Sequence, residues 1–384
     1  MKFNKILCRY GETALKSEHT RRFFEDKMIS NINKGLKSRN IEFTIKREPG
    51  RLYIKTKQWE EAADILKRVF GLTSVSPIKE FTIKADIEKI VNYAERFAKR
   101  FIRKEDTFAV RARRTGNDAF TSQMIERKVG ARIVESIGAK VDLTNPDKTL
   151  YIEVRQNRAF FFKDKIKCPG GLPLGTQGSV VVLFSGGIDS AVAAWMMMKR
   201  GCKIIPLYID SPYIEQKSAL EKARKVVEEL KKWSVGQNMK LVVVKNTWLT
   251  EILEKTRENL TCLLCKRMMY RVAEKVCERK KAKAIVTGEN LGQVASQTLD
   301  NIYVLDQTTH FPVIRPLIGL NKEEIVEMAK NIGTYNASIS SSHQCTAVPD
   351  SPRTKGKLNE ILKEEKKLDV EKLVEKSVKS MKTF

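Results

Sequence analysis

The first residues with chemical potential lie between Ser185 and Ser190, in a segment that reads SGGIDS. Two consecutive glycines let the backbone approach a phosphate closely, and a helix that starts beside them supplies amide donors. The two serine hydroxyls add donors, whereas the Asp189 carboxylate repels a phosphate unless a divalent cation lies between them. The lysine of a Walker loop is missing. The segment predicts a polyphosphate site with Mg²⁺; a plain strand-to-helix turn is the alternative.

Three cysteines form a second group. Cys262 and Cys265 have CxxC spacing in TCLLCKR, which places both thiols on one face if the segment is helical, and Cys345 lies in SSHQCTAVP. The CxxC pair is a metal-ligand or redox spacing, with packed core cysteines, a disulfide relay or a zinc site as alternatives. The other cysteines are expected to be structural: Cys8, Cys168, Cys202 and Cys277.

The composition favours nucleic acid as a partner. The 384 residues include 72 Lys and Arg against 46 Asp and Glu, a formal net charge of +26, and binding to a polyphosphate releases condensed counterions. A basic surface that serves solubility is the alternative. The residues expected to contact RNA phosphates lie on one predicted strand and the helix after it, where a solvated face is the alternative: Arg111, Arg113, Arg114, Lys128 and Arg132.

Membrane and secreted classes are disfavoured. The chain is 42% hydrophobic and 31% charged, and its apolar stretches fall far short of the roughly 20 residues that span a bilayer. The N-terminal segment lacks a signal-peptide pattern, and seven scattered cysteines do not form a secreted disulfide framework. We expect a cytoplasmic protein of two or three domains.

The pattern before residue 167 predicts two α+β domains, at residues 1–75 and 76–166. In TLYIEVR, apolar residues alternate with polar ones such as Glu153. This alternation predicts an antiparallel sheet with one solvent-exposed face. Residues 167–178 are rich in glycine and proline and are expected to be a linker.

The pattern changes at residue 179. From there to residue 384, continuous apolar strands alternate with helices, which predicts a doubly wound α/β domain with a parallel sheet covered on both faces. Ligands of such folds bind at the carboxyl ends of the strands. The SGGIDS segment follows the first strand, so we expect the site at that edge.

Several segments resemble known families. LFSGGIDS resembles the PP-loop motif SGGxDS of the ATP pyrophosphatases, which cleave ATP between the α- and β-phosphates. KRMMYRVAEKV, IVTGENLGQVASQTLDNI, FPVIRPLIGLNKEEIVEMAKNIGTY and GGLPLGTQG are similar to the tRNA 4-thiouridine synthetases of the ThiI type. VDLTNPDKTLYIEVRQNRAFFF is similar to their THUMP RNA-binding domain. The resemblance implies a ferredoxin-like domain at 1–75, THUMP at 76–166 and a PP-loop domain at 179–384.

The resemblance also implies a reaction. The expected enzyme is an ATP-dependent tRNA sulfurtransferase that adenylates uridine 8 of tRNA at O4, releases pyrophosphate and replaces the oxygen with sulfur. ATP and Mg²⁺ are the expected cofactors. Lys266 or Arg267 could offset negative charge at the α-phosphate, although a solvated helix face is the alternative. By resemblance, the residues at the nucleotide and its phosphates are Leu183, Phe184, Ser185, Gly186, Gly187, Asp189, Ser190, Tyr208, Ile209, Lys266, Gly288 and Gln297.

Sulfur chemistry is assigned by resemblance to Cys345, the family's catalytic cysteine. Some bacterial members add a rhodanese-like domain, whereas this sequence ends at Phe384 without one and resembles the archaeal type. There the CxxC and the catalytic cysteine are associated with an iron–sulfur cluster, so we expect Cys262, Cys265 and Cys345 to hold a 4Fe–4S or 3Fe–4S cluster. The alternative is a Cys345 persulfide resolved through a disulfide.

Several choices stay open. The expected sulfur donor is a cysteine desulfurase persulfide or inorganic sulfide, and a homodimer or a role in thiamine thiazole synthesis is compatible with the family. The rival functions are another PP-loop tRNA modifier, or a THUMP RNA-binding protein with an inactive α/β domain. A THUMP methyltransferase would need a GxGxG-like loop, which the sequence lacks.

Overall fold

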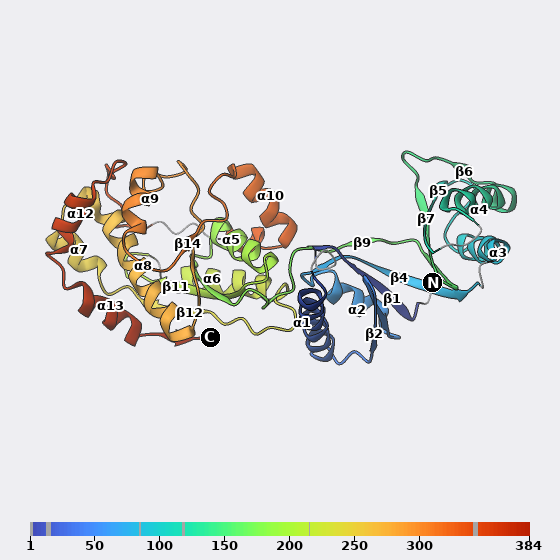
Figure 1. Cartoon of the computed structure of the whole chain (residues 1–384). Helices are drawn as coiled ribbons and strands as arrows, with labels where there is room; N and C mark the ends of the chain where they lie inside the picture. The colour runs from blue at the N-terminus through green and yellow to red at the C-terminus, as the bar shows by residue number, and fades with distance from the viewer. Residues whose placement is uncertain (1–2, 13–16, 84–85, 117–119, 215, 341–344) are drawn as a thin grey trace. The chain divides into compact units, whose positions relative to one another are not determined.

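The computed structural model describes residues 3–12, 17–83, 86–116, 120–214, 216–340 and 345–384. The chain divides into two compact units (Figure 1). Unit 1 comprises Met1–Arg21 and Ile32–Gly170, and unit 2 comprises Arg22–Asn31 and Gly171–Phe384. Among the described residues, every helix is too short or too polar to cross a membrane.

The strands up to residue 170 form one mixed sheet. Its described strands number nine, in the order β2-β3-β1-β4-β8-β7-β5-β6, with β9 also paired to β4. The elements of this part are β1 (Lys5–Tyr10), α1 (Glu18–Lys37), β2 (Thr44–Glu48), β3 (Arg51–Lys55), α2 (Trp59–Leu66), β4 (Leu72–Thr82), α3 (Ile87–Ala98), β5 (Thr107–Thr115), α4 (Ser122–Ile137), β6 (Lys140–Val141), β7 (Lys148–Arg155), β8 (Arg158–Phe162) and β9 (Ile166–Lys167). The domain boundary predicted between residues 75 and 76 lies inside β4, so this strand is shared by both halves of the sheet.

The sheet of unit 1 is covered on both faces at β7, which corrects the expectation of one solvent-exposed face. Leu150 and Ile152 pack against α3 and α4, as the alternation predicts. Glu153 points to the opposite face, yet it is only 3% exposed. It is buried because three arginine guanidiniums from β1, the start of β3 and β7 surround it. The strand pairs antiparallel with β8, as predicted, but parallel with β5.

Unit 2 is the predicted doubly wound α/β domain. Its described strands follow the order β14-β13-β10-β11-β12-β15, and all neighbours are parallel except the antiparallel pair β12 and β15. Its elements are β10 (Ser179–Leu183), α5 (Ile188–Lys199), β11 (Lys203–Asp210), α6 (Gln216–Lys231), β12 (Val242–Lys245), α7 (Leu249–Lys255), a 3-10 turn (Glu258–Leu260), α8 (Thr261–Lys280), β13 (Ile285–Val286), α9 (Leu299–Asp306), β14 (Val313–Ile314), α10 (Lys322–Ile332), α11 (Tyr335–Ser338), α12 (Leu358–Glu365), α13 (Val370–Lys379) and β15 (Lys382–Thr383).

Helices cover this sheet in two groups. Helices α5, α6, α10 and α11 pack against one another, whereas α8 packs against α7, α9 and α13 (Figure 1). The strand order reverses beside β10, because the chain continues to β11 on one side and returns as β13 on the other. Such a switch point opens a crevice at the carboxyl ends of the strands. The SGGIDS loop begins there.

Candidate functional site

The loop between β10 and α5 has the geometry of a phosphate cradle. Gly186 has a φ of 74°, and a Cβ added there would lie 2.8 Å from the Cα of Ala223, so this position requires glycine. Gly187 is the N-cap of α5, and Ser190 in the first turn donates its hydroxyl to the Gly187 carbonyl at 3.0 Å. The loop therefore presents the free amides of a helix N-terminus, which suit an anion.

Asp189 lies in the first turn of α5 and already has a cationic partner. Its side chain is 29% exposed, and the Nζ of Lys322 lies 2.6 Å from its carboxylate. Gln293 approaches the other oxygen at 3.5 Å. Lys322 begins α10, directly after the capping residue Asn321. The sequence analysis missed Lys322 because only the fold brings it to the loop; its signal is the NKEE capping box, which marks a helix start.

A pocket of about 330 Å³ opens at the ends of β10 and β11. Its walls are mostly apolar, and its volume is at the lower end of the roughly 300–1,000 Å³ of ligand pockets. Six residues that the resemblance assigns to ATP line it: Leu183, Phe184, Ser185, Gly187, Tyr208 and Ile209. The sequence analysis did not name the remaining lining residues, which are Leu207, Ile214, Ala219, Lys222 and Met269.

Lys266 forms an ion pair with the buried carboxylate of Glu289. Its Nζ lies 3.0 Å from Glu289, which is only 5% exposed. Glu289 also accepts hydrogen bonds from the Tyr270 hydroxyl at 2.8 Å, the Thr287 hydroxyl at 3.0 Å and the Arg315 Nε at 2.9 Å. Burial alone would raise the pKa of Glu289, but Lys266 and Arg315 lower that pKa to about 2. We call these five residues the Glu289 cluster; the sequence analysis found only Lys266 among them.

Other predicted residues have mainly structural contacts. Arg267 is 1% exposed and donates to Glu365 at 2.6 and 2.9 Å, so it cannot face a phosphate, which corrects its suggested role. A Cβ at Gly288 would lie 2.8 Å from the carbonyl carbon of Asp189, so Gly288 packs directly on the phosphate loop. Gln297 is half-buried in the loop before α9.

The CxxC cysteines lie at the start of α8, so their segment is helical. Cys265 is buried and accepts a hydrogen bond from the indole Nε1 of Trp248 at 3.2 Å, whereas Cys262 is half-buried. Cys345 is half-buried too. The N–H of its neighbour Thr346 donates to a carbonyl in the loop after β11 at 2.9 Å, which holds Cys345 at the strand-end side of unit 2.

The three thiols interact electrostatically without forming a ready metal site. Burial raises the pKa of Cys262 and the charge of Cys345 raises it further, while Lys266 lowers it. Burial raises the pKa of Cys265 to about 12. Within the described ranges, no three His, Cys, Asp or Glu side chains are grouped so that they could hold a metal ion. The cysteines expected to be structural are free and buried: Cys8, Cys168, Cys202 and Cys277.

The residues predicted to contact RNA lie on β5 and α4 of unit 1. Arg111 and Arg113 are exposed and Arg114 is half-buried. Arg111 donates to the carbonyl of Leu143. On α4, Lys128 and Arg132 pair with α3 carboxylates at 2.6 and 3.3 Å. These ion pairs are partly exposed, so water and RNA phosphates can compete for the cations.

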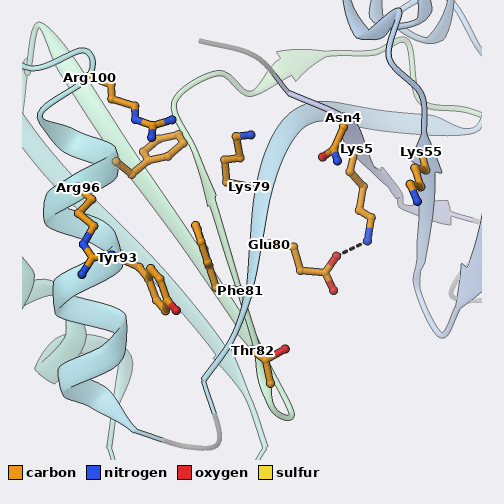
Figure 2. A pocket seen from close by; sticks show the side chains of 11 residues that line it. Asn4, Lys5, Lys55, Lys79, Glu80, Phe81, Thr82, Tyr93, Arg96 and Arg100 are labelled. Atoms are coloured by element: carbon orange, nitrogen blue, oxygen red, sulfur yellow. Dashed lines mark hydrogen bonds and ion pairs between the residues drawn. The ribbon is translucent and has the colours of Figure 1, made fainter.

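Unit 1 also contains a basic cavity of about 620 Å³ that the sequence analysis missed. The rings of Phe81 and Tyr93 stack there with centroids 4.0 Å apart, and Glu80 pairs with Lys5. Figure 2 shows cations that enter it from α3 and from the facing strands. The cations that line the cavity come from β1, β3, β4 and the end of α3 with the turn after it: Lys5, Lys55, Lys79, Arg96 and Arg100. Their separation in sequence hides the cluster.

Comparison with known proteins places the chain in a family. Family models match residues 5–76 (ThiI ferredoxin-like domain), 84–164 (THUMP domain) and 175–370 (ThiI, thiamine biosynthesis protein). A Methanosarcina mazei protein named probable tRNA sulfurtransferase is 41% identical over 99% of this chain and 95% of its own length. The chain belongs to the ThiI family. A Thermococcus kodakarensis protein of the same name is 42% identical over 94% of this chain and 96% of its own.

Solved structures agree with the ThiI assignment. A crystal structure described as a 4-thiouridine synthetase–RNA complex with bound ATP is similar with a TM-score of 0.85 and 34% identity. The match covers 100% of this chain and 99% of that one. The ferredoxin-like, THUMP and PP-loop architecture predicted from the resemblance is thereby confirmed.

Proposed function

We propose that this ThiI-family chain is an ATP-dependent tRNA sulfurtransferase. It adenylates uridine 8 of tRNA at O4, releases pyrophosphate, and replaces the oxygen with sulfur to give 4-thiouridine. The observation that carries the proposal is the SGGIDS loop with its helix N-terminus beside a nucleoside-sized pocket, in a chain 41% identical to a protein named probable tRNA sulfurtransferase.

In this proposal the apolar pocket takes the adenosine, and the loop amides and serine hydroxyls take the phosphates. Asp189 would hold Mg²⁺, which would neutralise phosphate charge; this suits a carboxylate that already attracts the Lys322 ammonium. Lys322 then turns to a phosphate oxygen. Lys266 offsets charge on the α-phosphate while the uridine O4 attacks it. The uridine leaves the folded RNA to reach this crevice, as targets of base-modifying enzymes do.

The test is tRNA-dependent pyrophosphate release by Asp189→Ala. We expect turnover to be abolished with little loss of stability, because surface changes typically cost within about 0.5 kcal/mol. Asp300→Ala is the matched control, since Asp300 is an exposed carboxylate in the first turn of another helix, α9. Wild-type turnover by the Asp189 variant contradicts the role.

Sulfur transfer is proposed to run through Cys345, Cys262 and Cys265, which interact electrostatically, either on the iron–sulfur cluster predicted from the resemblance or through a persulfide. In the persulfide scheme, the terminal sulfur of a Cys345 persulfide attacks C4 and AMP leaves. A Cys262 or Cys265 thiolate then attacks the Cys345 Sγ, which frees the thiouridine and leaves a disulfide for an external thiol to reduce. The iron–sulfur cluster predicted from the resemblance is the alternative, and a desulfurase persulfide or sulfide is the donor.

Anaerobic iron and labile-sulfide analysis separates these schemes. Iron-free protein that is fully active with a sulfur donor supports the persulfide, whereas iron content that tracks activity supports the cluster. In both schemes Cys345→Ser loses 4-thiouridine formation but retains pyrophosphate release, because adenylation needs only ATP and tRNA.

Unit 1 is proposed to bind the tRNA backbone through the β5 and α4 cations and the basic cavity. Replacing Arg111 and Arg113 with Ala should reduce the slope of log affinity against log salt by about one per lost phosphate contact. Lys231→Ala with Lys232→Ala, at the last residue of α6 and the residue after it, is the control in unit 2. An unchanged slope in the arginine variant places the RNA surface elsewhere.

A further inference from the structure

We propose that Glu289 is a positioning residue for adenylation, because it holds the Lys266 ammonium beside the phosphate loop until the phosphates of ATP accept it. The inference rests on the proposed function and assigns a role to a carboxylate that the sequence analysis did not single out. Three observations support it. The two oxygens of Glu289 have different donors, the carboxylate keeps three donors when Lys266 leaves, and the neighbouring Gly288 packs on the phosphate loop.

The two carboxylate oxygens of Glu289 have different partners. Oε2 accepts from three groups: the Tyr270 hydroxyl, the Thr287 hydroxyl and the Arg315 Nε. Oε1 accepts from Lys266 at 3.0 Å. The three donors at Oε2 come from α8, the end of β13 and the segment after β14, so they fix the carboxylate plane. Oε1 is thereby aimed at one donor, the ammonium.

Lys266 can leave this cluster without stranding a charge. Arg315 stays on Glu289, and its own Nη1 lies 3.1 Å from Asp306, so the carboxylate keeps a guanidinium and two hydroxyls. Removal of every partner from a buried charge would be costly, whereas removal of one of four donors is not. A lysine is a point charge on a flexible stem, unlike the rigid fork of arginine. Its side chain is 24% exposed, so it has a route to a ligand.

The backbone next to Glu289 packs against the phosphate loop. Gly288, the residue before it, would place a Cβ only 2.8 Å from the Asp189 carbonyl carbon and the Ser190 nitrogen. Its backbone therefore lies in contact with the loop. On α8, Met269 lies three residues after Lys266 and lines the nucleotide pocket. Lys266 is thus on the helix that lines the pocket, and its partner Glu289 directly follows the residue packed on the loop, so in the proposed complex the ammonium faces the α-phosphate.

Two other roles fit the geometry less well. As a general base, Glu289 would have to accept a proton, but both of its oxygens already accept hydrogen bonds, and a pKa of about 2 makes it a weak proton acceptor. As a purely structural ion pair it would resemble Glu365, whose two oxygens face Arg267 and Arg271 from the same helix α8. In that pair the inner arginine is fully buried. In the Glu289 cluster the donor at Oε1 is a half-buried lysine, whose point charge on a flexible stem can exchange partners more readily than the forked guanidiniums on Glu365.

The test measures tRNA-dependent pyrophosphate release against ATP concentration for Glu289→Gln, Lys266→Ala and the double variant. We expect Glu289→Gln to lower kcat/KM for ATP about tenfold while kcat changes less than about threefold, since the lost contact is made in the free enzyme and is given up once ATP binds. The double variant should be no slower than Lys266→Ala, because a positioning residue has nothing to act through once the ammonium is gone. Multiplying effects in this cycle overturn the proposal.

Asp306→Asn is the matched control. It removes a carboxylate from the same Arg315 and leaves the Lys266 contact intact, so kcat/KM for ATP should stay within about twofold of wild type. If Glu289→Gln does not fold by circular dichroism, Tyr270→Phe replaces it, since it removes one donor at Oε2 and should show a smaller loss of kcat/KM with the same non-additivity. Wild-type protein without pyrophosphate release refutes the proposed function; active wild type with an additive cycle refutes only the role of Glu289.

Discussion

Each unit contains a buried glutamate that accepts hydrogen bonds from several cations or hydroxyls, Glu153 in unit 1 and Glu289 in unit 2, and the two differ in their cations. In unit 1, Glu153 receives guanidinium groups from Arg9 at 3.2 Å, Arg51 at 3.2 Å and Arg155 at 2.8 Å. We call these four residues the Glu153 cluster. In unit 2, Glu289 receives one guanidinium, two hydroxyls and one ammonium. Both carboxyl groups have a lowered pKa, because nearby cations outweigh burial.

The difference lies in what the donors are free to do. Arg9 also donates to Ser76 at 2.9 Å and lies 4.7 Å from the Phe162 ring centre, so its fork joins β1, β4, β7 and β8 in one place. Lys266 has a single charged atom and can exchange partners. The arginines of the Glu153 cluster therefore hold several strands of the sheet together. In the Glu289 cluster, by contrast, the single lysine can leave its carboxylate and bind a ligand phosphate.

The largest expected effect is on the Glu153 cluster. Glu153→Gln should lower the free energy of unfolding of unit 1 by about 3–5 kcal/mol, because it leaves three guanidiniums without their shared counter-charge. Urea unfolding followed by circular dichroism measures this change. Glu135→Gln is the control, since Glu135 is an exposed residue of α4. A loss below about 1 kcal/mol would mean that the arginines find other partners.

Acid should weaken the Glu289 cluster next. The pKa of Glu289 is lowered from 4.5 to about 2, so its stabilising contribution is complete above pH 4.5 and is lost as pH falls through about 2. By linkage this contribution is on the order of 3 kcal/mol. The gap in Tm between wild type and Glu289→Gln should therefore be full at pH 6 and close towards pH 2. A gap that does not change with pH contradicts this.

Replacing one glycine by alanine in each unit should change the stability of the two units in opposite directions. Gly288→Ala forces a Cβ to within 2.8 Å of the loop backbone, which should cost about 1–3 kcal/mol and weaken ATP binding. Gly130→Ala on α4 meets no atom within 4 Å and should instead stabilise by about 0.5–1 kcal/mol. Thermal unfolding and ATP titration measure both. Equal changes in Tm and in ATP affinity for the two variants would contradict the inference that the close packing of Gly288 on the phosphate loop matters.

The smallest effect is an exchange of cation type. Lys266→Arg keeps the charge but places a fork on Glu289, so kcat for pyrophosphate release should fall about tenfold, or about 1.4 kcal/mol, with an unchanged Tm. Arg9→Lys is the reverse change in unit 1, and it should lower Tm without altering turnover. If Lys266→Arg is as active as wild type, the point charge is not what the site requires.

The sequence predicts what depends on local pattern. Apolar runs and the Gly-Gly turn predict the parallel sheet and the phosphate loop, and the CxxC spacing predicts two thiols on one helix. The partners of these groups are not predictable in the same way, because Lys322, Glu289 and Arg315 meet the site only through tertiary packing. Glu153 shows the limit most clearly: alternation placed it on a solvent face, but arginines 102 and 144 residues away in sequence bury it.

The shared strand β4 has a consequence for how the protein is made. Its first part pairs with β1, which precedes it, but its later part, from Lys79 to Thr82, pairs with β8, and the second edge of Ser74 and Val75 pairs with β9. Both of these pairings form only after residues 158–167 have been synthesised. During translation this strand therefore waits with an open edge, which invites pairing with other nascent chains. Lys79 and Glu80 lie in the waiting part. Their charges discourage such pairing until the late strands arrive, so a Val at either position should lower the yield of soluble protein more than its stability.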